Sequence, residues 1–173
     1  AAGVRTGAIE AIIGEGVAVV RVMPNTPSLV GEGAAAVAGG RAASDEDIEW
    51  AAGILSAVGE VVVVPEALLD AVTGLSGSGP AYVFLLAEAL MDAGEAEGLP
   101  REVAVALTEQ TLLGAATLLS RSDDPAATLR ENVTSAGGTT AAGLAVFEAG
   151  GFRQLVSDVV AAATERSRQL GAG

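Results

Sequence analysis

The sequence predicts an α/β segment over residues 1–64 and an all-α segment over residues 65–173. In the first segment, short β-branched runs alternate with apolar residues at helical spacing, which is typical of an α/β sheet. Strand patterns end at Pro65, and only helical patterns follow. Aromatic residues make up only 3 % of the chain, so the core must consist of Ala, Val and Leu, whose small size lets helices approach closely.

Two helices and three strands are expected in residues 1–64. The helices are Val4–Ile13, ending at Gly14, and Asp45–Val58, with Ser44 as N-cap and Asp47 three residues later. The expected strands are Val17–Val22, dense enough in β-branched residues to be buried on both faces, a weaker Gly33–Ala38, and Glu60–Val64.

Six helices are expected after Pro65: Glu66–Val72, Pro80–Glu97, Arg101–Ser120, Pro125–Val133, Thr139–Ala149 and Phe152–Leu170. The stretch from Tyr82 to Leu86 is apolar on nearly every face of its helix, and such a helix must be surrounded by other protein. We expect a subunit interface there; the alternative is a central helix inside one monomeric bundle.

The residue types that are missing narrow the chemistry. The chain has no Cys, His or Lys, so disulfides, Cys/His zinc sites, Ser-His or Cys-His pairs and lysine Schiff bases are excluded. A net charge of −13 argues against binding to nucleic acid or an anionic membrane surface. No uninterrupted apolar run approaches the ~18 residues of a membrane span, and no metal site is expected. Hydroxyls, carboxylates, backbone amides or a cofactor must carry any reaction.

The most informative stretch is Val133–Thr140, which reads Val-Thr-Ser-Ala-Gly-Gly-Thr-Thr. Its double glycine lets a ligand approach the backbone closely, and a helix is expected to begin at Thr139. The free N–H groups and positive dipole end of a first helical turn favour a carboxylate or phosphate. A small anionic ligand is therefore expected here; the alternative is a glycine-rich loop with a Thr cap.

Three further stretches contain glycine or proline next to polar residues. Arg21–Pro27 follows a strand and could form a rigid ligand-binding loop, or simply a proline-stiffened turn. Gly77–Pro80 could present amides to an anion, or form an ordinary helix entry. Gly31–Ala36 fits a relaxed dinucleotide-binding pattern, but no strand runs into it and no helix follows, so a turn is expected.

Together and in this order, these stretches resemble the pyrroline-5-carboxylate reductase family. The matching segments are Ala1–Val4, Arg21–Pro27, Asp70–Tyr82, Val133–Thr140 and Gly150–Arg153. Two features differ: Ala136 stands where the family usually has proline, and the nucleotide-binding half with the G-x-G-x-x-G turn is missing. The resemblance thus implies an α/β remnant of a Rossmann-type dinucleotide domain over residues 1–64, followed by an all-α dimerisation and substrate-binding domain over residues 65–173.

The resemblance also implies an activity, which is hydride transfer from NADPH or NADH to the imine carbon of 1-pyrroline-5-carboxylate, giving proline. The expected enzyme is cytoplasmic and a homodimer, or a higher assembly of dimers. This chain alone is expected to be inactive and to bind nucleotide poorly. The rival hypothesis is a non-catalytic helical dimerisation module. Another dehydrogenase of similar plan is disfavoured because the chain has no Lys.

The family's site residues can be carried over by position. Met23, Pro24 and Asn25 would lie by the cofactor. The substrate would be bound by Ser135, Gly137, Gly138, Thr139 and Thr140, with Ser76 and Gly77 lining the site from the dimerisation domain. Thr140 would hydrogen-bond the ring nitrogen and is the candidate catalytic residue. A protonated imine is already electrophilic, so orientation and local electrostatics can do most of the work.

Overall fold

The computed structural model describes residues 3–14 and 16–171, so Ala1 and Ala2 of the first matching segment lie outside it. The chain divides into two compact units. The first unit contains the described residues up to 81 together with those from 156 onward, and the second contains residues 82–155. The boundary expected between residues 64 and 65 stays a prediction. The α/β-then-helical order of elements is as expected from the sequence.

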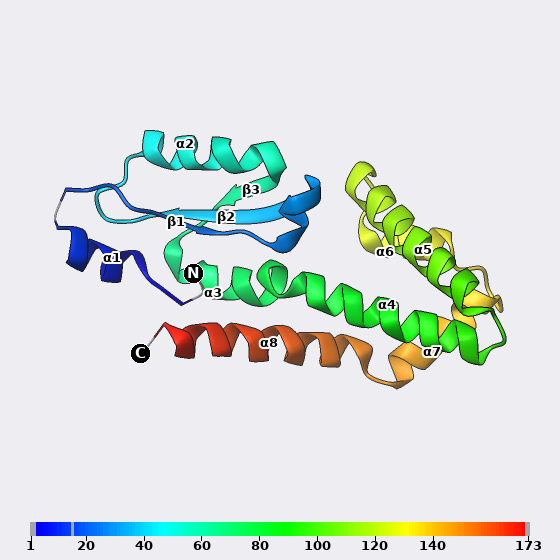
Figure 1. The fold of residues 1–173 in the computed structure, drawn as a ribbon. Coiled ribbons are helices and arrows are strands. Elements are labelled where there is room, and N and C mark those ends of the chain that lie inside the picture. Colours follow the sequence, from blue (N-terminus) through cyan, green and yellow to red (C-terminus); the bar gives the residue numbers. More distant parts are fainter. Residues whose placement is uncertain (1–2, 15, 172–173) are drawn as a thin grey trace. The chain divides into compact units, whose positions relative to one another are not determined.

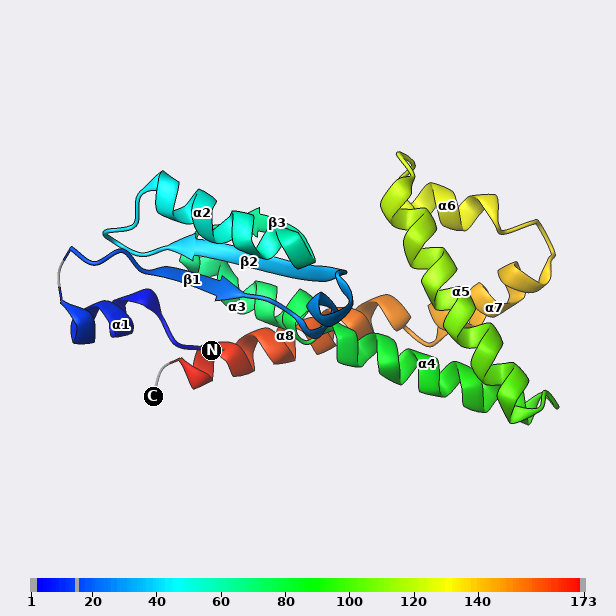
Figure 2. The same ribbon diagram turned by 45° about the horizontal axis from the view of Figure 1, so that its top comes forward.

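The first unit contains a mixed sheet with β2 in the middle (Figure 2). Its strands are β1 (Val20–Met23), β2 (Gly33–Gly39) and β3 (Gly59–Val63). β1 pairs antiparallel with β2, and β2 pairs parallel with β3. The strand expected at Val17–Val22 begins three residues later. It is not buried on both faces, because Arg21 is the single buried residue of β1 and the other three are half-buried. Within the described sheet β1 is also an edge strand that pairs with β2 alone.

Helices cover both faces of this sheet (Figure 1). On one face lies α2 (Asp45–Leu55), which Ser44 and Asp47 begin with a reciprocal capping box; a 3₁₀ turn replaces its expected last residues. On the other face, Leu69 packs against Ala36 and Ala38 to form the core. The weakly predicted middle strand is thus the best buried, because alanine side chains let helices approach closely from both sides.

The segment after β3 is less regular than expected. A 3₁₀ turn (Glu66–Leu68) leads into the short helix α3 (Leu69–Val72), then into a π-helical turn (Thr73–Gly77) and then into α4 (Gly79–Ala96). The hydroxyls of Thr73 and Ser76 bond back to backbone carbonyls four residues earlier, at 2.8 and 3.1 Å. Such π-turns occur often at functional sites.

The part of the last helix, α8 (Phe152–Leu170), that belongs to the first unit packs against α3 and this turn. Ser167 donates a buried hydrogen bond of 2.6 Å to Asp70 of α3. A Cβ atom at Gly74 would collide with the Thr164 hydroxyl and lie 2.8 Å from the Val160 carbonyl. The chain therefore needs glycine at residue 74 for α8 to pack this closely.

The carboxylate of Glu66, in a partly buried ion pair with Arg21, also attaches α1 (Thr6–Ile13) to the sheet. The carboxylate of Glu66 accepts hydrogen bonds from the Thr6 amide (2.7 Å) and hydroxyl (2.8 Å), and pairs with the Arg21 guanidinium at 3.3 Å. The Arg21 side chain is only 6 % exposed. Partial burial raises the pKa of Glu66, but the hydrogen bonds from Thr6 and Arg21 outweigh it, so this pKa lies below its ordinary value of 4.5.

Glu66→Gln should therefore destabilise the first unit by about 2 kcal/mol near pH 7, since it leaves the buried Arg21 without a counter-charge. The pKa of Glu66 is lower in the folded than in the unfolded state, so its contribution is complete above pH 4.5 and is lost as the pH falls through the folded value. Urea unfolding of the unmodified chain and of Glu66→Gln at pH 7 and pH 3.5 measures the difference in their free energies of unfolding. Equal stability differences at the two pH values would contradict it.

The second unit consists of helices and encloses little core. Besides most of α4 it contains α5 (Arg101–Arg121), α6 (Ala126–Asn132), α7 (Thr139–Ala149) and the start of α8. Each of these lies within one residue of its expected bounds. Ala104 is the single buried apolar residue among those described in this unit, whereas Phe84 and Leu85 are 62 % and 66 % exposed. The alternative of a central helix inside a monomeric bundle was wrong, because the other helices do not enclose α4.

Helix α5 is the one helix in the described part of the chain that is long and apolar enough to cross a membrane by length and composition. It contains no uninterrupted apolar run of that length, but its mean hydropathy reaches 1.4 over 18 residues. Only 11 % of that window is buried. One such helix is weak evidence for a membrane span, because a helix at a subunit interface has the same composition.

Candidate functional site

The expected cofactor loop and the Ser76–Gly77 turn meet in the first unit. The loop follows β1, and the turn is the end of the π-helical segment. The side-chain amide of Asn25 donates a hydrogen bond to the Ser76 carbonyl at 3.1 Å. A Cβ atom at Gly77 would lie 2.6 Å from the terminal carbon of Met23. Met23 and Asn25 of the loop thus contact Gly77 and Ser76 of the turn, although the two segments are about 50 positions apart in the sequence.

Asn25 also organises its own loop. Its side-chain oxygen accepts a hydrogen bond from the Ala34 amide at 2.8 Å, and its backbone carbonyl accepts one from the Ser28 hydroxyl at 2.9 Å. The 3₁₀ helix Thr26–Val30 follows and ends at Gly31, whose φ of 82° favours glycine. The Gly31–Ala36 stretch is therefore a turn into β2, as expected. Pro24 is exposed beside this loop.

The five expected substrate-binding residues form a single turn in the second unit. Gly137 has a φ of 71°, and Gly138 begins α7 without any side-chain cap. The Gly138 amide donates to the Ser135 carbonyl at 3.0 Å. Thr139 and Thr140 occupy the first turn of α7, and both are exposed. The N-cap of α7 is Gly138 and not a threonine, so the Thr cap of the alternative is not formed. Binding of a small anion at this turn stays a prediction.

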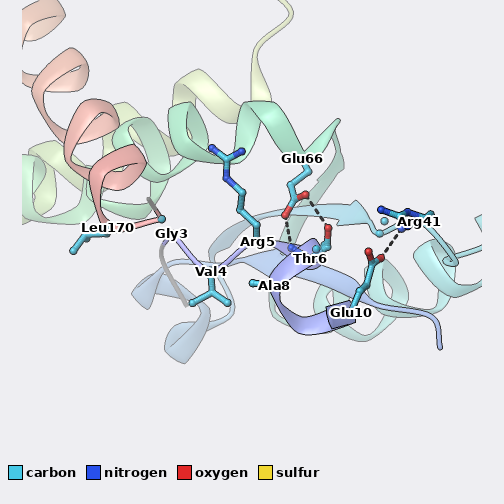
Figure 3. A pocket seen from close by; sticks show the side chains of 13 residues that line it. Gly3, Val4, Arg5, Thr6, Ala8, Glu10, Arg41, Glu66 and Leu170 are labelled. Atoms are coloured by element: carbon cyan, nitrogen blue, oxygen red, sulfur yellow. Dashed lines mark hydrogen bonds between the residues drawn. The ribbon is translucent and has the colours of Figure 1, made fainter. Parts of the chain in front are cut away.

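A cavity formed by α1, the end of β2 and Glu66 is lined by other residues (Figure 3). It has a volume of about 800 Å³ and lies in the first unit. Its carboxylates are already engaged: Glu10 accepts from the Arg41 amide at 2.6 Å, and Glu66 binds Thr6 and Arg21. No expected site residue lines it. Each unit therefore contains one candidate motif region: the Met23–Asn25 loop with Ser76 and Gly77 in the first unit, and the Ser135–Thr140 turn with its exposed hydroxyls in the second.

No group of three or more His, Cys, Asp or Glu side chains that could hold a metal occurs among the described residues. Two features of the site were missed from the sequence. One is the π-helical turn, and the other is the bridge from Asn25 to Ala34 and Ser76. The signal for the bridge was an Asn enclosed by two prolines directly after a strand, a position where its side chain can replace missing backbone partners.

The helical part of the chain decides the family. A family model described as pyrroline-5-carboxylate reductase dimerisation matches residues 66–170.

This chain belongs to the pyrroline-5-carboxylate reductase family.

Curated relatives of the same name agree with this assignment. The chain is 51 % identical to the pyrroline-5-carboxylate reductase of Arabidopsis thaliana over 151 residues, which cover 87 % of this chain and 55 % of the relative. It is also 51 % identical to that of Synechocystis over 154 residues, which cover 89 % of this chain and 58 % of the relative. The chain therefore spans a little over half the length of these two pyrroline-5-carboxylate reductases.

Solved structures of the family share the fold. A pyrroline-5-carboxylate reductase from Coxiella burnetii matches 97 % of this chain and 63 % of its own, with a TM-score of 0.94 and 42 % identity. A pyrroline carboxylate reductase from Plasmodium falciparum, solved with NADP bound, matches 98 % of this chain and 68 % of its own, with a TM-score of 0.90 and 38 % identity. The α/β portion and the helical portion thus both follow the architecture of the family.

Proposed function

We propose that this chain is the substrate-binding and dimer-forming part of a reductase that converts 1-pyrroline-5-carboxylate to proline with NADPH or NADH. The observation that carries the proposal is the uncapped N-terminus of α7, preceded by Gly137 and Gly138 and bearing two exposed threonines. This arrangement offers backbone N–H groups to a carboxylate and a hydroxyl to a ring nitrogen. Family membership supports the choice of substrate.

In this proposal each group of residues has one task. The Gly138 amide donates to the Ser135 carbonyl and shapes the turn. The amides of Gly137 and Thr139, with Ser135 and Gly138 beside them, bind the substrate carboxylate, and the Thr140 hydroxyl bonds the ring nitrogen. Met23, Pro24 and Asn25 form the wall of the nicotinamide site, next to Ser76 and Gly77. The cofactor supplies the hydride when bound, and the protein residues supply orientation and local electrostatics.

The same proposal includes a homodimer or a higher assembly of dimers, and a cytoplasmic location. Support for the dimer comes from the large exposed apolar side chains of α4 and α5, which include Phe84, Leu85, Leu107 and Leu113. Exposed apolar patches of this kind mark interaction surfaces. The domain boundary near residue 64 also belongs to the proposal, with the nucleotide pyrophosphate bound outside this chain.

An activity assay separates the reductase from the non-catalytic dimerisation module. We expect a protein that joins this chain to a family nucleotide-binding region to oxidise NADPH or NADH only when 1-pyrroline-5-carboxylate is present. The 173-residue chain alone should bind NADPH poorly in calorimetry and still sediment as a dimer. A dimeric joined protein that binds the cofactor but shows no turnover would favour the module instead.

A further inference from the structure

The side chain of Asn25 bridges two segments of the first unit. Its amide nitrogen donates to the Ser76 carbonyl at 3.1 Å, and its oxygen accepts from the Ala34 amide at 2.8 Å. A carboxamide has two N–H donors and an oxygen with two lone pairs in one planar group, and one donor and one lone pair are used here toward different segments. A single side chain therefore holds the loop to both neighbours.

The bond to Ala34 continues the sheet past the end of its ladder. The antiparallel pairing of β1 and β2 ends at Met23, which lies opposite Ala36. The Ala34 amide is two residues beyond that point, where β1 has already turned into the Met23–Pro24 loop. Asn25 supplies the missing acceptor through its side chain, and so fixes the loop to the rigid central strand.

The bond to Ser76 ties the same loop to the π-helical turn. The contact beside it is tight, because a Cβ atom at Gly77 would lie 2.6 Å from Met23 Cε. The turn is held on its far side by α8, through the Asp70–Ser167 bond and the close approach at Gly74. Met23 itself also packs against the Ala36, Ala38 and Leu69 core. The Asn25 side chain adds a hydrogen-bonded link between the loop and the turn.

We propose that Asn25 is a positioning residue that couples the nicotinamide loop to the substrate-lining turn. This inference rests on the proposed reductase function. Without the Asn25 bonds the loop can move away from the turn, and the cofactor wall then separates from the substrate wall. Asn25 therefore affects the binding of both NADPH and 1-pyrroline-5-carboxylate.

The decisive variant is Asn25→Asp, because it replaces the NH₂ donor by an oxygen and leaves the size and shape of the side chain nearly unchanged. An ionised Asp keeps an acceptor for the Ala34 amide but places a carboxylate oxygen against the Ser76 carbonyl. A protonated Asp regains an O–H donor for that carbonyl. The variant should therefore recover as the pH falls, whereas Asn25→Ala, which has neither group, should not.

We expect Asn25→Asp in the joined reductase to lower kcat/KM at least tenfold at pH 8 for both substrates. The ratio of its activity to that of the unmodified enzyme should rise at least threefold between pH 8 and pH 5. The ratio for Asn25→Ala should stay flat. Gln169→Glu makes the same chemical change at an exposed position of α8, outside the proposed dimer surface, and should leave activity unchanged at every pH. A rise in KM confined to NADPH in both Asn25 variants would overturn the proposal and make the side chain a cofactor ligand.

Hydrogen exchange provides a readout that does not depend on activity. In the 173-residue chain, Asn25→Ala should speed exchange of the Ala34 amide at least tenfold while the amides inside α2 keep their rates. Unchanged protection at Ala34 would contradict the coupling even if the enzyme were active. Conversely, an unmodified joined protein without turnover would refute the reductase function, and the exchange result would still decide whether Asn25 holds the loop.

Discussion

Thr140→Val is expected to lower the turnover of the joined reductase well over tenfold. Thr140 lies in the first turn of α7, is exposed, and follows the Gly137–Gly138 pair. Valine has nearly the same shape as threonine but lacks the hydroxyl that would bond the ring nitrogen of the substrate. Loss of a group that assists proton transfer typically reduces rates by 10²–10⁴-fold. Steady-state kinetics with NADPH and 1-pyrroline-5-carboxylate measure the effect.

Two further variants make this result specific to the hydroxyl. Thr140→Ser keeps the hydroxyl and should retain most of the turnover, whereas Thr140→Ala should behave like Thr140→Val. Neither substitution touches the backbone amides that would bind the carboxylate, so KM for 1-pyrroline-5-carboxylate should change less than kcat. Unchanged turnover in Thr140→Val would remove Thr140 from the mechanism.

Gly59→Ala is expected to be the most destabilising single change in the first unit. Gly59 begins β3 with a φ of 153° and a ψ of −165°, a backbone conformation that is essentially restricted to glycine. A Cβ atom there would collide with the backbone of Gly33 in the neighbouring strand. Backbone strain and the separation of β2 from β3 together should cost about 4 kcal/mol. For a chain of this size that corresponds to a fall in Tm of roughly 10 °C.

The matched control is Gly53→Ala, in the same unit. Gly53 lies inside α2, and a Cβ atom there would meet nothing within 4 Å. Alanine favours a helix interior over glycine by about 0.5–1 kcal/mol, so this variant should be slightly more stable than the unmodified chain. Thermal unfolding followed by circular dichroism compares the two. Equal Tm values for Gly59→Ala and Gly53→Ala would show that the Gly33–Gly59 contact does not limit stability.

The helices of the second unit were predictable to within a residue because local signals define them. Pro100 directly precedes α5, Gly138 precedes α7, and Gly151 precedes α8. Capping residues and prolines act through the backbone of the next few residues, so their effect can be read from the sequence. The capping box of Ser44 and Asp47 was predictable for the same reason.

The β-strands and the turn after α3 were less predictable. Val17–Val22 has the composition of a doubly buried strand, but burial depends on which segments lie on either side, and β1 pairs with β2 alone in the described sheet. The π-helical turn Thr73–Gly77 has no strong local signal. It is stabilised by bonds to carbonyls four residues earlier and by the packing of α8 against Gly74.

The candidate site also has one part that could be predicted from the sequence and one part that could not. The Gly137–Thr140 turn could be located from the sequence, since a double glycine followed by two threonines marks a helix start. That Gly138, and not a threonine, is the N-cap is seen only in the structure. The link between Asn25 and Ser76 could not, because the two residues are 51 positions apart and meet only when the strand end and the π-turn are both in place.

The sequence by itself determined the helical segments, the α/β-then-helical order and the chemistry that is excluded by the lack of Cys, His and Lys. These properties follow from residue type and local spacing. Only the tertiary structure decided that β2 is the buried centre of the sheet, that Glu66 joins α1 to Arg21, and that Asn25 holds the loop to the turn. Each of these depends on contacts between distant segments, whose partners are set by the packing of the whole unit.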